Sequence, residues 1–416
     1  MAARCRQNAK AKANVCTPVL LHSCILIRKS LPIPCSRPAR FCKSLRIPPS
    51  HLGIPQKPKT MIKIAKLLLA AMLVVPAMVS AKNKVVVVMV DGYRWQELFR
   101  GADSMLVNTK EFGNPDMMKA DFWRPTADER RSALMPFTWS HIAKNGVMIG
   151  NRDKGCRMSV TNNMWFSYPG YNETLCGYPD DKNINSNAPV DNPNMTVFEV
   201  ANNTPEYRGK VLVFGSWGRF IQIFNEKRSG LEVNANYRHS LAKQPTEREL
   251  YVDKMQDGTP RYWEEERFDV FTHEYAVEAM KSRHPELLFV GYGDTDEWAH
   301  AGNYRLYLEA ANDVDRFIRE LWETAQADPF YKDQTTFIIT CDHGRGVSAD
   351  KGWFHHSREV DRSNETWLMA FGAGVPAKGV LTSGEYHNNQ VAATVASLLG
   401  ISFAPQHEGA GKAITF

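Results

Sequence analysis

Aspartate and histidine side chains follow short apolar runs of this 416-residue chain at the points where the runs end. Asp91 comes directly after the run 85–90, and Asp342 and His343 follow the run 336–340. Carboxylate and imidazole groups together are typical ligands of Zn²⁺ and similar transition ions. These residue types at these positions indicate a metal site.

A third apolar run, 287–292, leads into Asp296 and His300. Their spacing of four residues places both side chains on one side of a helical turn. One aspartate after a strand is usually a turn or a helix cap. Three runs that end in this way, two of them with a histidine, are hard to explain by capping. His355 and His356 are further candidate ligands.

The apolar runs also predict the fold. They are continuous rather than alternating, which is typical of parallel strands buried on both faces. Helical patterns cover 305–326 and 390–399, the second of which ends at Gly400. The sequence therefore predicts an α/β fold, with a central, mostly parallel sheet sandwiched by helices and the site at the carboxyl ends of the strands. The predicted strands are 85–90, 211–214, 287–292, 336–340 and 367–371.

Five segments, taken in chain order, resemble the alkaline phosphatase superfamily, and most closely its nucleotide pyrophosphatase/phosphodiesterase-like (type I phosphodiesterase) branch. The segments are VVVVMVDG, SYPGYNETLCG, GDTDEWAHAG, TCDHG, and HHS followed by Trp367. The resemblance spans roughly residue 84 to the C-terminus and implies an alkaline-phosphatase-like fold. One Asp-His-Gly alone is a weak signal, whereas five segments in the family's order are a strong one.

The resemblance implies two zinc ions. One ion would be held by Asp296, His300 and His356, and the other by Asp91, Asp342, His343 and the Ser167 oxygen. The spacing back from Trp367 favours His356 over His355. Ser167 falls on the nucleophile position, where a bound zinc would activate the hydroxyl and a phosphoserine intermediate would form.

The implied activity is hydrolysis of a small-molecule phosphate ester, as a phosphodiesterase or a phosphatase. The family also implies an oxyanion-binding asparagine after the nucleophile, for which Asn187 fits best, although Asn183 and Asn185 are close. Such donors stabilise charge on the transferring group. Gly170 and Tyr171 depart from the family's usual Asn-His, and the branch commonly has threonine at the nucleophile position.

No arginine is placed by a motif to clamp a terminal phosphate, which leans slightly towards diesters. Arg152, Lys154 and Arg219 are open candidates for that role.

Two alternatives remain. A sulfatase of the same superfamily needs a Cys or Ser within C/S-x-P-x-R, but the fourth position after Ser167 is Tyr171 rather than arginine. The histidines also favour zinc over an oxygen-ligated calcium ion. The second alternative, a non-catalytic metal- or ligand-binding protein on this fold, is disfavoured by the intact set of ligands and nucleophile.

The net charge of +6 comes from the N-terminal part of the chain. Residues 1–81 hold 14 of the 51 Lys and Arg and none of the 45 Asp and Glu, so the remainder is acidic. A second methionine, Met61, begins a positively charged and then apolar stretch that ends in small residues at 79–81, as a secretory signal does. Its apolar part, 67–79, is short for a membrane span, which needs about 20 residues.

We therefore expect a basic leader or mis-assigned upstream start at 1–60, a signal peptide at 61–81, and a single catalytic domain at 82–416. Loop or cap insertions near the site are expected at about 93–145 and 178–265. A cleaved signal implies a periplasmic or secreted protein, with no nucleic-acid partner and no stable membrane span. An exported protein permits a Cys156–Cys176 disulfide, but two free thiols are as compatible with the sequence.

Overall fold

The computed structural model describes residues 83–347 and 352–416. Its main feature is an eight-stranded sheet with the strand order β5-β4-β6-β1-β7-β8-β2-β9. The strands are β1 (Lys84–Val90), β2 (Gly146–Ile149), β4 (Val211–Gly215), β5 (Glu232–Ala235), β6 (Leu287–Tyr292), β7 (Thr335–Thr340), β8 (Leu368–Gly372) and β9 (Gly379–Val380). A separate two-stranded sheet pairs β3 (Cys156–Ser159) with β10 (Gly384–His387).

The prediction of a mostly parallel sheet is confirmed. Strands β5, β4, β6, β1 and β7 are parallel neighbours, whereas β8 runs antiparallel to both β7 and β2. All five predicted strands are present, with their bounds shifted by no more than one residue.

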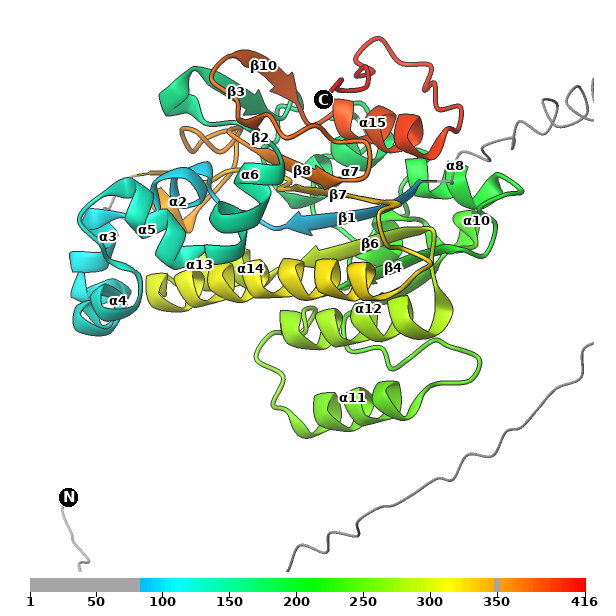
Figure 1. Ribbon diagram of the computed structural model, residues 1–416, viewed down its shortest axis with the longest axis horizontal. Coiled ribbons are helices and arrows are strands. Elements are labelled where there is room, and N and C mark those ends of the chain that lie inside the picture. The colour runs from blue at the N-terminus through cyan, green and yellow to red at the C-terminus, as the bar shows by residue number, and fades with distance from the viewer. Residues whose placement is uncertain (1–82, 348–351) are drawn as a thin grey trace, which may run out of the picture. The chain divides into compact units, whose positions relative to one another are not determined.

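Helices cover both faces of the sheet because β1 is apolar in every position but the first. Val86, Val88 and Val90 belong to one hydrophobic core, whereas Val85 and Val87 belong to the other. Helices α12 (Asp269–Arg283) and α14 (Tyr304–Ala327) lie on the first face. Helices α7 (Ser167–Cys176), α8 (Val197–Asn203) and α15 (Gln390–Leu399) lie on the second (Figure 1).

The segment 93–145, expected to form loops and small excursions, is largely helical. It contains α2 (Trp95–Arg100), α3 (Ser104–Asn108), α4 (Pro115–Phe122), α5 (Ala127–Leu134), a π-helix (Thr138–Ile142) and α6 (Ala143–Asn145), with a 3-10 turn at Lys110–Phe112. These helices are short and carry local caps: the Asn114 side chain caps α4, and Thr126 with Glu129 forms a capping box on α5. Short capped helices leave little periodicity to read.

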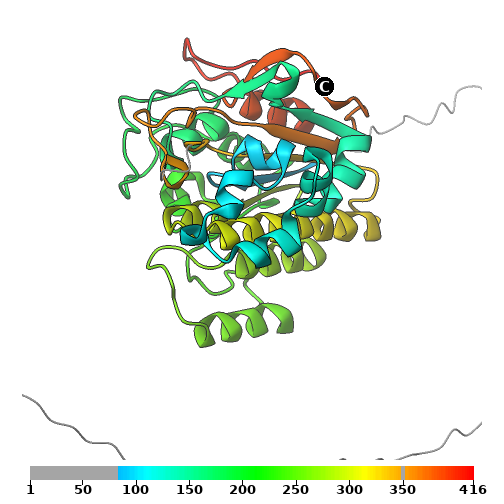
Figure 2. The same cartoon turned by 90° about the vertical axis from the view of Figure 1, so that its left-hand side faces the viewer.

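The segment 178–265 is not a simple insertion either. It supplies β4 and β5 to the main sheet and also carries α8, α9 (Phe220–Ile223), α10 (Glu226–Ser229) and α11 (Glu247–Gly258). Figure 2 shows α11 as the outermost helix, beyond α12. The expected leader and signal peptide lie outside the described residues. Within those residues, no helix combines the length and apolar character that a membrane crossing needs.

Candidate metal centre

Three neighbouring strands deliver the predicted ligands to one edge of the sheet. In the register, Val90 of β1 lies opposite Tyr292 of β6, and Met89 lies opposite Thr340 of β7. The residues that follow these strands therefore emerge side by side. Helix α13 (Asp294–His300) begins two residues after β6.

The first group of side chains surrounds Nε2 of His343. That nitrogen lies 3.2 Å from Asp91 Oδ1, 3.4 Å from Asp342 Oδ2 and 3.3 Å from Ser167 Oγ. All four side chains are buried. The structure thus brings together the four residues that the resemblance assigned to one ion.

The second group lies beside the first. Nε2 of His300 is 3.0 Å from Asp296 Oδ2 and 2.9 Å from Nε2 of His356. Nε2 of His343 is 3.8 Å from Asp296 Oδ1, and the rings of His343 and His356 stack with centroids 3.9 Å apart. The two groups form one continuous centre, in which His343 contacts members of both.

The donor atoms fit a bound cation. Asp91 Oδ1 and Asp342 Oδ2 are buried and accept no hydrogen bond. Nδ1 of His343 lies 2.9 Å from the Gly344 carbonyl oxygen, which can only accept, so Nδ1 is the donor and Nε2 can present a lone pair to a metal. Ligand atoms around tetrahedral zinc, with bonds of about 2.0–2.1 Å, lie about 3.3 Å apart, close to the separations seen here.

The electrostatics of the first group point the same way. Burial, reinforced by Asp91, raises the pKa of Asp342 well above its ordinary value. Burial and the charge of Asp296 raise the pKa of Asp91. Burial lowers the pKa of His343, but Asp342 and Asp91 outweigh it and raise that pKa to about 9. The cluster is short of positive charge, which a divalent cation supplies.

Arg345 belongs to the centre but was not anticipated from the sequence. Its buried guanidinium donates to Asp296 Oδ1, to the Trp353 carbonyl oxygen at 3.0 Å and to the Phe354 carbonyl oxygen. Burial raises the pKa of Asp296, but Arg345, followed by His300, outweighs it and holds that pKa well below its ordinary value. Arg345 therefore ties Asp296 to the segment that leads to the last ligand. The three letters after TCDH are GRG, and no motif marks this arginine.

Ser167 is the first residue of α7, so its hydroxyl lies at the positive end of a helix, a favourable place for a phosphate. The loop before it is fixed by Glu173 on the same helix. Glu173 accepts hydrogen bonds from the backbone N–H groups of Thr161 and Asn162, each at 2.8 Å. Glu173, which follows Ser167 in the chain, thus fixes the segment that precedes Ser167.

Of the three candidate asparagines, Asn187 is the one that contacts the nucleophile segment. Its Oδ1 accepts a hydrogen bond of 2.9 Å from the backbone N–H of Tyr168, and its Nδ2 donor is not used in that bond. Asn183 and Asn185 donate instead within the nearby turn at 180–182.

The residues considered for a phosphate clamp are placed elsewhere or already engaged. Arg152 donates to β3 at Met158 and Ser159, and Lys154 is exposed. Arg219 follows β4 and forms an ion pair with Glu265.

His355, the other histidine considered as a ligand, is exposed, and its ring centroid lies 6.5 Å from that of His300.

The cysteines at 156, 176 and 341 are buried free thiols, so the structure contains no Cys156–Cys176 disulfide.

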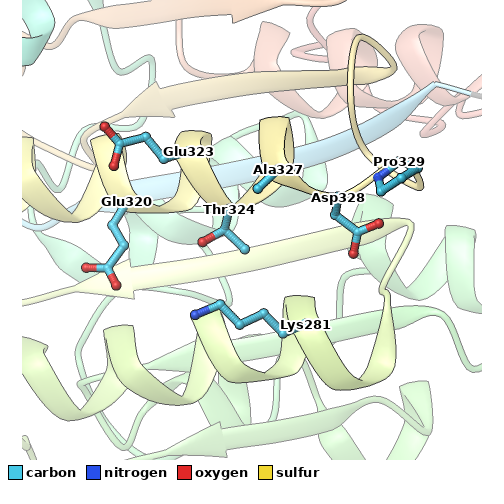
Figure 3. A pocket seen from close by; sticks show the side chains of 7 residues that line it. All are labelled: Lys281, Glu320, Glu323, Thr324, Ala327, Asp328 and Pro329. Atoms are coloured by element: carbon cyan, nitrogen blue, oxygen red, sulfur yellow. The ribbon is translucent and has the colours of Figure 1, made fainter. Parts of the chain in front are cut away.

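A surface cavity of about 560 Å³ lies between α12 and α14, apart from the metal centre. We call it the α12–α14 groove. Figure 3 shows its lining side chains: Lys281 on α12, and Glu320, Glu323, Thr324, Ala327, Asp328 and Pro329 on or just after α14. It contains none of the predicted site residues.

Comparison with known proteins supports the architecture. A family model described as the Metalloenzyme superfamily matches residues 264–360, the segment that carries Asp296, His300, Asp342, His343 and His356. No curated protein sequence matches the chain.

Solved structures match over most of the chain. The wild-type alkaline phosphatase PafA has a TM-score of 0.52 at 10% identity, covering 80% of this chain and 98% of that one. The lipoteichoic acid synthase LtaP from Listeria monocytogenes has a TM-score of 0.51 at 9% identity, covering 80% and 76%. The fold is alkaline-phosphatase-like. The resemblance read from five short segments is confirmed at this level, whereas its nucleotide pyrophosphatase branch stays a prediction.

Proposed function

We propose that the chain is an exported hydrolase of phosphate esters that uses two zinc ions and Ser167 as its nucleophile. One observation carries this proposal. The Ser167 hydroxyl lies 3.3 Å from the same His343 nitrogen that Asp91 and Asp342 face, so the proposed nucleophile lies among buried side chains that would hold a metal ion. Three histidines beside the carboxylates favour zinc among the possible ions.

Two bound zinc ions would supply Lewis acidity that lowers the proton affinity of the hydroxyl and stabilises charge on the leaving oxygen. Ser167 Oγ would attack phosphorus, form the phosphoserine bond and release the leaving alcohol. Water would then cleave that bond and regenerate the serine hydroxyl, releasing phosphate from a monoester substrate or a phosphate monoester from a diester substrate. The N-terminal end of α7 and the Nδ2 group of Asn187, whose Oδ1 contacts the Tyr168 backbone N–H, would hold the anionic phosphoryl oxygens.

The sulfatase alternative has less support. The position that would need arginine is Tyr171, whose hydroxyl is engaged with Asp91. Export rests on the signal-like segment 61–81 and is proposed with the activity.

The test compares p-nitrophenyl phosphate, bis-p-nitrophenyl phosphate and p-nitrophenyl sulfate as substrates of the purified protein, with zinc and after chelation. We expect zinc-dependent turnover of one or both phosphate esters at a higher kcat/KM than the sulfate. Preferential sulfate hydrolysis would contradict the proposal, as would stoichiometric zinc without turnover of any ester.

The variant Ser167→Ala should lower turnover by at least about 10⁴-fold while most of the metal remains, since the nucleophile itself is lost. Ser282→Ala, which removes an exposed hydroxyl on α12, is the matched control and should retain activity. Undiminished turnover by Ser167→Ala would exclude Ser167 as the nucleophile.

A further inference from the structure

Tyr171 reaches from α7 into the metal centre. It lies one helical turn after Ser167, its side chain is 1% exposed, and its hydroxyl donates a 3.0 Å hydrogen bond to Asp91 Oδ2. Tyr171 is one of the positions at which the nucleophile segment departs from the motif that it resembles. The departure therefore coincides with a buried contact to a proposed ligand.

Because of this contact, the two carboxylate oxygens of Asp91 have different partners. Oδ2 accepts from Tyr171, whereas Oδ1 faces His343 Nε2 at 3.2 Å and accepts no hydrogen bond. A carboxylate can rotate about its terminal torsion, because that torsion is broad. The tyrosine hydroxyl opposes such rotation and keeps one oxygen directed at the centre.

The ring of Tyr171 is itself held in place by aromatic packing. Phe220 packs edge-on against it with ring centroids 4.8 Å apart. Phe220 lies over Gly215 of β4 and Gly291 of β6, where an added Cβ would come within 2.2 Å and 2.5 Å of the Phe220 ring. Two glycines in adjacent strands thus make room for the side chain that supports Tyr171.

A second departure, Gly170, also brings α7 close to a proposed ligand. A Cβ at this position would lie 2.3 Å from the backbone oxygen of Asp342, a separation that real Cβ atoms do not show. Glycine therefore allows α7 to approach Asp342 closely. Gly170 and Tyr171 together dock α7 onto both carboxylates of the first ligand group.

We propose that Tyr171 is a positioning residue, which orients Asp91 for the metal ion that Asp91, Asp342 and His343 would hold. The proposal rests on the metal centre of the proposed function. Partners of this kind, which hydrogen-bond a ligand rather than the metal, typically change metal affinity by about 10- to 100-fold when they are removed.

The experiment compares Tyr171→Phe with Tyr168→Phe in the full chain. Tyr168 lies on the same helix, is also 1% exposed, and donates its hydroxyl to the Val190 backbone oxygen at 2.7 Å. Both variants lose one buried hydroxyl and one hydrogen bond, but only Tyr171 contacts a proposed ligand. Zn²⁺ affinity and stoichiometry are measured by competition with a chelator, and the d–d spectrum of Co²⁺-loaded protein reports ligand geometry.

We expect Tyr171→Phe to weaken one of the two ions by about 10- to 100-fold and to change the Co²⁺ spectrum of that site. The metal affinity of Tyr168→Phe should stay within about twofold of the wild type, because the Tyr168 hydroxyl contacts the Val190 backbone rather than a proposed ligand, and distant sites usually act independently. Equal metal affinities in the two variants would overturn the inference. A wild-type chain that binds fewer than two ions would instead contradict the proposed function on which the inference rests.

A double-mutant cycle covers the case in which Tyr171→Phe is simply destabilised. Asp91→Ala removes the group through which Tyr171 is proposed to act. Tyr171→Phe should therefore have no further effect on metal affinity in the Asp91→Ala background. An additional loss of the same size in that background would show a general structural role and overturn the inference.

Discussion

The metal centre and the α12–α14 groove are both lined by acidic side chains, but the two regions differ in the partners that these side chains have. In the groove each acid has a basic partner nearby, and the pairs are Glu320 with His273 at 3.1 Å, Asp328 with His284 at 2.8 Å, and Glu323 with Arg319 at 3.9 Å. In the centre, Asp91 and Asp342 are buried and share one imidazole, that of His343.

The difference shows that a surface cavity does not by itself mark the place where the candidate metal ligands converge. The groove is open to solvent, which screens its charges. Its carboxylates therefore need little stabilisation from other protein groups. Buried carboxylates without partners are strongly unfavourable unless a cation or a proton compensates them. Converging donor atoms that accept no hydrogen bond therefore mark the candidate site, which lies apart from the groove.

The largest effect is expected when one carboxylate is neutralised in each region. Asp342→Asn removes a proposed ligand whose Oδ2 accepts no hydrogen bond, so we expect metal affinity to fall by more than about 100-fold, beyond the effect of an outer partner. Zinc content after dialysis against a chelator, together with turnover of p-nitrophenyl phosphate, measures the effect.

Glu323→Gln is the matched control in the groove, because Glu323 is exposed and weakly paired. It should leave both zinc content and turnover at the wild-type level. If Asp342→Asn keeps its zinc, the carboxylate of Asp342 does not hold the metal and the contrast between the two regions disappears.

The sequence predicts those structural features that are encoded within a single segment of the chain. The strand β6 and the helix α15 were predicted with their observed bounds, because continuous apolar runs and amphipathic spacing are visible within a single segment. The motifs then placed all seven proposed ligands near one another. Strands β2, β3, β5, β9 and β10 were not predicted, since each has no more than four residues.

The contacts of Arg345 and Tyr171 with the centre could not be predicted from the sequence, for a different reason. Arg345 reaches Asp296, 49 residues away in the chain, and Tyr171 reaches Asp91, 80 residues away. No spacing rule connects such pairs until the sheet brings the strand ends together. In the sequence Tyr171 is a departure from the motif, which is a usable signal: an unexpected residue inside a matched segment identifies where to look for a compensating contact.

A second prediction concerns the side of the centre where substrate would bind. Asn187→Ala removes the side chain beside the nucleophile segment, and loss of one such donor typically lowers kcat by about 10²- to 10³-fold. Zinc content should stay unchanged, because Asn187 is not a proposed ligand. Steady-state kinetics on the preferred phosphate ester give the measurement.

Asn183→Ala and Asn185→Ala serve as controls of the same chemistry, since both side chains donate within their own turn. We expect each to keep kcat within a few-fold of the wild type. A large loss in either control with none in Asn187→Ala would move the substrate-binding role to another asparagine.

The smallest effect is expected in the groove itself. Lys281 is exposed on α12 and faces the acidic side chains of α14 across the groove. Lys281→Ala should change the free energy of unfolding by no more than about 0.5 kcal/mol, as surface substitutions usually do, because solvent already screens the charges around it. Chemical denaturation measures that change, and zinc content and turnover should match the wild type. A fall in turnover with the zinc retained would couple the groove to catalysis, and cavity volume would then have pointed to a second functional region after all.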